Sequence, residues 1–129
     1  MDIMHFEVKN KEYKLHFGVR FVASLDKVET IKDSSGIEFG MGTVIVKEKL
    51  EMGSFEALAN VIRCAIYDRK FSQDDILAEL ENHTDLMGLF EEIESEIKNS
   101  QAVQVVEKKM EALDNEENRK KAVKKHMNK

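Results

Sequence analysis

The side chain best suited to nucleophilic chemistry in this sequence is the thiol of Cys64, the only cysteine among 129 residues. A nucleophilic cysteine needs a positioned base to generate its thiolate, and no motif around Cys64 supplies one. A single cysteine also cannot form an internal disulfide, which fits a reducing compartment. The sequence therefore predicts a partly buried structural thiol.

Histidines are the next candidates, as metal ligands. The four are His5, His16, His83 and His126. None lies at i, i+4 from another ligand in a zinc-binding pattern. His5 and His16 are expected on neighbouring strands, as a solvent-facing pair across the ladder, and His83 in a connection between helices. The sequence predicts no metal site and no cofactor.

Two further patterns bear on catalysis and phosphate binding. The glycines of Gly40-Met41-Gly42 lack both the Gly-Lys-Ser/Thr ending of a P-loop and the three-glycine dinucleotide pattern. No pair of carboxylates lies in a context that would raise a pKa for acid–base work. We therefore expect a protein that is not an enzyme.

Charge is distributed unevenly along the chain. Residues 1–99 carry 12 Lys/Arg and 20 Asp/Glu, whereas residues 100–129 carry 8 and 5. The stretch 71–97 has nine acids and no Lys or Arg. This part of the chain is poorly suited to nucleic acid, which needs a basic face. The acids at 91–96 indicate a solvated helix face or, alternatively, a surface that attracts a basic partner.

The cluster of five Lys and Arg residues at 119–125 is the one strongly basic segment. It could touch phosphates, but no aromatic side chain is interleaved to stack on bases. We expect a solubilising tail or a contact for an acidic partner.

The elements that position these residues begin with a hairpin. Apolar residues alternate over 4–8 and 13–17, with polar residues 9–12 between them. This pattern predicts two antiparallel strands with one apolar face. Such a hairpin must pack on helices or another subunit, and its free edge favours self-association.

Amphipathic periodicity then predicts helices. The expected ranges are 19–29, 42–51, 55–68, a helix that Ser72 caps, and a helix that Thr84-Asp85 opens and that ends near 99. Residues 32–36 are a loop by composition. Beyond 100 only a thin apolar seam continues to Leu113, and little order is expected from Asn115.

The expected fold is therefore α+β: an N-terminal β-hairpin packed on a bundle of about five helices, followed by a helical or disordered tail. We expect a domain over 1–100 and a charged tail over 101–129. No signal peptide or membrane span is recognisable, so a cytoplasmic location is expected.

The order of these patterns resembles the tail assembly chaperones of long, non-contractile-tailed (siphovirus-type) phages and prophages of Gram-positive bacteria. The resemblance spans about residues 3–100, and its most specific part is Gly36-Ile37-Glu38-Phe39-Gly40-Met41-Gly42. One departure is the hairpin turn, where Asn10-Lys11 stands in place of Asn-Gly-Lys, which leaves the turn type open.

The resemblance implies a non-catalytic chaperone that acts in the host cytoplasm and is absent from the mature virion. Its implied partners are the tape measure protein, which it would keep soluble until tail tube subunits polymerise around it, and the tube protein, through a longer frameshifted form. We expect a homo-oligomer. The residues expected to touch partners are apolar ones near the glycine segment and after the next helix: Phe39, Met41, Val44 and Met52.

Two alternatives remain open from the sequence alone. The chain could be a small protein-binding adaptor, with the basic tail as its contact. It could also be a regulator that binds nucleic acid through that tail, which the acidic body disfavours.

Overall fold

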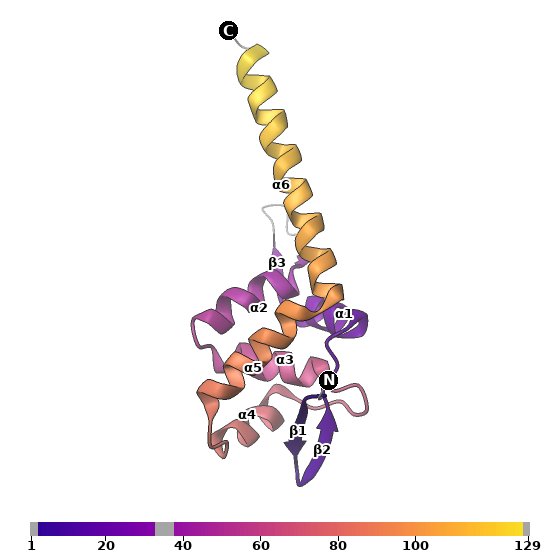
Figure 1. Ribbon diagram of the computed structural model, residues 1–129, viewed down its shortest axis with the longest axis vertical. Helices are drawn as coiled ribbons and strands as arrows, with labels where there is room; N and C mark the ends of the chain where they lie inside the picture. Colours follow the sequence, from indigo (N-terminus) through magenta and orange to yellow (C-terminus); the bar gives the residue numbers. More distant parts are fainter. Residues whose placement is uncertain (1–2, 33–37, 128–129) are drawn as a thin grey trace.

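The computed structural model describes the backbone of residues 3–32 and 38–127 and the side chains of residues 3–29 and 41–116. A two-stranded hairpin comes first, a second small hairpin is inserted between two helices, and four further helices follow (Figure 1). The elements are β1 (His5–Val8), β2 (Lys11–Lys14), α1 (Val19–Val28), β3 (Thr30–Lys32), β4 (Glu38–Gly40), α2 (Gly42–Glu51), α3 (Phe55–Ala65), α4 (Gln73–Glu81), α5 (Leu86–Asn99) and α6 (Gln101–Met127).

The N-terminal hairpin has the predicted apolar face. Strands β1 and β2 are antiparallel, with Phe6 opposite Tyr13. The two turn residues, Lys9 and Asn10, have φ of 52° and 67°. Positive φ at both positions is what a type I′ turn requires, and this turn matches the twist of the strands. The buried face packs on the helices and consists of Met4, Phe6, Val8, Tyr13 and Leu15.

Helix α3 is the centre of the core. It contacts α1, α2 and α4, and eight of its residues are buried. Ser54 caps it by accepting a hydrogen bond from the amide of Ala57 at 3.2 Å. The helix ends at Ala65, three residues before the predicted end, because the next residues turn extended and the Ala65 carbonyl accepts a hydrogen bond from the amide of His16.

The remaining body helices confirm the predicted periodicity. Ser72 begins α4 with a capping box in which Asp75 accepts from the Ser72 amide at 3.0 Å. Asp85 caps α5 by accepting from the amide of Gly88. The buried face of α5 has the spacing of an amphipathic helix and consists of Leu89, Phe90, Ile93 and Ile97. The fold class, an N-terminal hairpin on a helical bundle, is therefore as expected.

The second hairpin was not predicted. Strands β3 and β4 pair antiparallel, with Ile31 opposite Phe39. The composition predicts a loop followed by a flexible glycine segment, because three-residue strands are too short for alternation to be recognised. The predicted loop residues 33–36 lie outside the described residues.

Helix α6 is the helical form of the expected C-terminal tail. It continues past Asn115, beyond which little order was expected, as one helix to Met127. Ser100 caps it by accepting from the amide of Val103, and its hydroxyl donates to the carbonyl of Phe17. At its base Val103 is fully buried, and the C-terminal half of α6 projects away from the body (Figure 1).

Candidate partner-binding surface

The four residues expected to touch partners do not form one patch. Met41 precedes α2 and Val44 lies in its first turn, and both are half-buried. Met52 follows the other end of α2 and is 81 % exposed. A ten-residue helix is about 15 Å long, so Met52 is separated from the other two. The side chain of Phe39 lies outside the described residues.

Met52 instead joins apolar residues that the sequence did not single out together. Three large side chains are exposed at the start of α3 and α5 and the end of α2: Met52 at 81 %, Phe55 at 49 % and Met87 at 72 %. The Phe55 and Phe90 rings lie 5.6 Å apart. We define the methionine patch as Met52, Phe55, Leu86, Met87 and Phe90.

Two adjoining depressions make this surface concave. A pocket of about 310 Å³ lies between Phe55, Leu77, Leu80 and Leu86. A second, of about 370 Å³, is lined by all five residues of the methionine patch. Concave apolar surface of this kind suits an apolar side chain from a partner.

Local structure at the α2–α3 turn explains why Met52 and Phe55 flank this surface. Gly53 has φ of +78°, which favours glycine, and its amide donates to the carbonyl of Leu50 at 3.0 Å. Ser54 then caps α3. The tight turn places Met52 and Phe55 on either side of it, while Asp85 starts α5 just before Met87.

The rim of the methionine patch is acidic. Among the described residues that line the two pockets, four are glutamates and none is Lys or Arg; the glutamates are Glu51, Glu81, Glu91 and Glu94. Three of these four glutamates lie in the stretch 71–97, which has no Lys or Arg. An apolar surface surrounded by negatively charged side chains favours a partner with apolar and basic side chains.

A third depression, of about 710 Å³, lies between the hairpin and the end of α5. Its exposed apolar residues are Ile3 and Val19, at 49 % and 77 %. Its lining includes Lys14 and Arg20 as well as Glu96, so its charge is mixed. It therefore differs from the methionine patch, around which all the charged residues that line the pockets are acidic.

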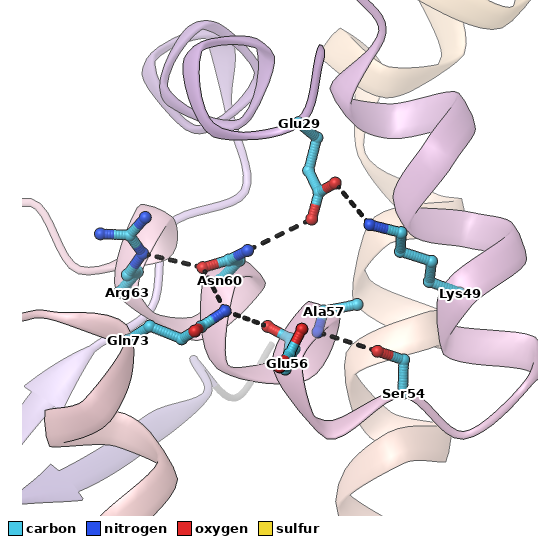
Figure 2. Close-up of polar contacts among 8 residues, drawn as sticks. All are labelled: Glu29, Lys49, Ser54, Glu56, Ala57, Asn60, Arg63 and Gln73. Carbon is cyan, nitrogen blue, oxygen red and sulfur yellow. Dashed lines mark hydrogen bonds and ion pairs between the residues drawn. The ribbon is translucent and has the colours of Figure 1, made fainter. Parts of the chain in front are cut away.

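A buried polar network joins α2 to α3 and to the residue that follows α1 (Figure 2). Glu29, just after α1, is 6 % exposed. Its carboxylate accepts a hydrogen bond from the Lys49 ammonium of α2 at 2.9 Å and another from the side-chain amide of Asn60 in α3 at 3.2 Å. The side-chain oxygen of Asn60 in turn accepts hydrogen bonds from the side chains of Arg63 and Gln73. Three helices are thus joined through one carboxylate.

Close backbone contact adds to this anchoring. The amide of Gly42 donates to the Asp26 carboxylate at 2.8 Å. A Cβ at Gly42 would lie 2.6 Å from the carbonyl carbon of Leu25. Only glycine fits there, which gives one physical reason for the last glycine of the Gly-Ile-Glu-Phe-Gly-Met-Gly segment.

Cys64, His5 and His16 are among the residues that were considered for catalysis or metal binding. Cys64 is buried, and desolvation raises the pKa of its thiol to about 11. His5 and His16 are not the solvent-facing pair that was expected: His5 lies opposite Lys14, whereas the ring of His16 stacks on Tyr67 at 4.6 Å. His16 lies beyond the last residue of β2, and its amide donates to the carbonyl of Ala65 at the end of α3.

Neither a metal-binding cluster nor a membrane-spanning helix is found in the part of the chain that the structure describes. No group of three or more His, Cys, Asp or Glu residues there could hold a metal ion. No helix among those residues is long and apolar enough to cross a membrane.

Comparison with known families gives one match. A family model described as phage tail assembly chaperone protein, TAC, matches residues 5–112. This span begins at β1 and ends within α6, and it includes the whole methionine patch. No curated protein and no solved structure matches the chain.

Proposed function

The chain belongs to the phage tail assembly chaperone family, and on that premise we propose that it binds the tape measure protein and keeps it soluble until tail tube subunits polymerise around it. We place this role in the host cytoplasm, for a siphovirus-type phage or prophage of Gram-positive bacteria. The protein acts without catalysis and is left out of the mature virion. Contact with tube protein is proposed for a longer, frameshifted form of the chain.

The methionine patch is the observation that supports this proposal most directly. Exposed methionine side chains are flexible and adapt to varied apolar partners. A partner helix can lay its apolar stripe into a concave apolar surface, with anchors at i, i+3 and i+4. Met52, Phe55 and Met87 supply such a surface, and the two pockets beside them accept the anchors.

A chaperone of this kind must also release its partner. A small apolar surface gives moderate affinity per copy, and many copies along one long partner give avidity. Acidic residues around the patch favour encounter with basic segments and disfavour like-charged partners. Tube subunits can then displace the copies one by one.

The test is co-expression with the tape measure protein of the same genome. The measured quantity is the fraction of tape measure protein that stays in the soluble lysate. Met52→Gln combined with Met87→Gln should lower that fraction toward the value without chaperone. Each buried Met side chain contributes about 1.5–3 kcal/mol, so the pair should weaken binding about 100-fold or more.

A matched control comes from a surface outside the methionine patch. Val19 is as exposed as Met87 but lies outside the methionine patch, so Val19→Gln should keep the partner soluble. Neither variant should unfold the chain, because all three side chains are mostly in solvent. An unchanged soluble fraction with the double Met variant would contradict the assignment of the patch, and no solubilisation by the wild type would contradict the function itself.

A further inference from the structure

The C-terminal half of α6 carries a charge pattern that neither the family match nor the methionine patch explains. Residues 111–116 are all exposed, and Leu113 is 57 % exposed. Near its base α6 contacts α1, α2 and α5, and its C-terminal half then projects beyond the body (Figure 1). A stable helix that is polar on all sides either bridges to another body or is held by many charge pairs four residues apart.

The charges along this half are divided into two segments. Residues 111–117 contain four acids and no Lys or Arg, namely Glu111, Asp114, Glu116 and Glu117. Residues 119–125 contain five basic residues and no acid. Asn118 separates them, and the helical backbone continues through both to Met127. We call these the acidic segment and the basic segment.

We propose that α6 pairs antiparallel with α6 of a second copy of this chain, with the overlap centred near Asn118. In that register the acidic segment of each copy lies beside the basic segment of the other. A parallel arrangement would instead place like charges side by side. The overlap of residues 111–125 is about 22 Å long.

The pairing is self-complementary, because each copy offers both halves of the contact. Such an isologous contact closes with two copies and leaves no open end. Leu113, exposed in the single chain, comes level with residues 123 and 124 of the other copy. Apolar residues Met110 and Met127 come level with each other at the two ends of the overlap.

Nucleic acid fits this element less well than a second copy does. Phosphates would meet the basic segment but would be repelled by the acidic segment directly beside it. The order of the two segments also stabilises a single α6 helix. Basic residues are favourable near the C-terminus of a helix, and an acid four residues before a base forms a stabilising pair. These effects account for a stable helix, whereas pairing predicts association that depends on both segments at once.

The test uses the full chain and two charge-reversed variants. The basic variant carries E111K, D114K, E116K and E117K, and the acidic variant carries R119E, K120E, K121E, K124E and K125E. In sedimentation at low salt the wild type should dimerise, with at least a tenfold weaker dimer at high salt. Each variant alone should be monomeric, and an equimolar mixture should form a mixed dimer. A monomeric wild type at low salt, or a mixture that fails to associate, would overturn the proposal.

Orientation is tested separately in the otherwise wild-type helix, which guards against loss of helicity in the variants. A short bismaleimide should join Asn118→Cys chains to each other. It should not join Ala112→Cys chains, because antiparallel pairing places the two copies of residue 112 about 18 Å apart along the axes. Cys64 can stay, since it is buried. Equal crosslinking at both positions, or none at either, would contradict antiparallel pairing.

Discussion

The buried carboxylate of Glu29 offers the sharpest test of how the body is held together (Figure 2). Its side chain is 7 % exposed, whereas its partner Lys49 is 46 % exposed. Removing the two charges separately should therefore have unequal effects. Lys49 can return to solvent when it loses its partner, but the Glu29 carboxylate cannot.

The magnitudes follow from these exposures. Glu29→Gln keeps the side-chain volume and an acceptor for the Asn60 amide, and loses a charged hydrogen bond to a half-exposed lysine. Its cost should be about 1 kcal/mol. Lys49→Met leaves a buried carboxylate with one neutral donor, Asn60, and should cost about 2–3 kcal/mol. The double variant buries no charge and should cost about 1–1.5 kcal/mol, less than the sum of the single changes.

The assay is a double-mutant cycle. The free energy of unfolding of each variant is measured in urea, with circular dichroism as the signal. We expect a coupling energy of about 2 kcal/mol between Glu29 and Lys49, with an unchanged slope of the free energy of unfolding against urea. Lys47→Met is a matched control, because Lys47 pairs with Glu107, which is 39 % exposed and remains hydrated. Additive effects, or a Lys49→Met variant as stable as Lys47→Met, would refute the reasoning.

Three other predictions concern single sites. Gly42→Ala should destabilise the chain by about 1–3 kcal/mol in thermal unfolding, despite the better helix propensity of alanine, because the new Cβ meets the Leu25 backbone. Cys64 should react with a disulfide reagent at pH 8 about 100-fold or more slowly than in guanidinium chloride, since burial raises its pKa to about 11; a fast native reaction would contradict its burial. Hydrogen bonds from the amide and hydroxyl of Ser72 lower the pKa of Asp75 below its ordinary 3.8. The resulting stability is present above that value and lost as pH falls through the folded pKa, so Asp75→Asn should be less stable than wild type at pH 7 and close to it in strong acid.

Much of the fold could be predicted because its signals are local. The hairpin face at Phe6 and Tyr13 follows from period-two alternation, and the turn follows from a residue, Asn10, that tolerates positive φ. The starts of α3 and α4 follow from Ser54 and Ser72, whose side chains satisfy amides that the helix leaves free. These features depend on residues within a few positions of one another.

The parts that were missed depend on distant or distributed contacts. The β3–β4 hairpin has three-residue strands, and its base is fixed by the Met41 amide, which donates to the Glu29 carbonyl. Nothing in the spacing of residues 30–40 signals that bond. Likewise, Met52 was expected to touch a partner, but Met87, which lines the same pocket, is 35 positions away, and only the packing of α5 on α2 brings the two into one surface.

The two proposed surfaces should respond differently to salt, which allows them to be separated in one protein. Contact at the methionine patch is mainly apolar, and burial of apolar surface is little changed by simple salt at moderate concentration. Pairing through α6 is mainly electrostatic, between the acidic and the basic segments, and the screening length falls from about 30 Å at 0.01 M to about 3 Å at 1 M salt. Raising the salt should therefore dissociate copies of the chaperone from one another while the tape measure protein stays bound. Loss of both interactions together would mean that partner binding depends on the α6 pair, and persistence of both would show that the acidic and basic segments do not hold the copies together.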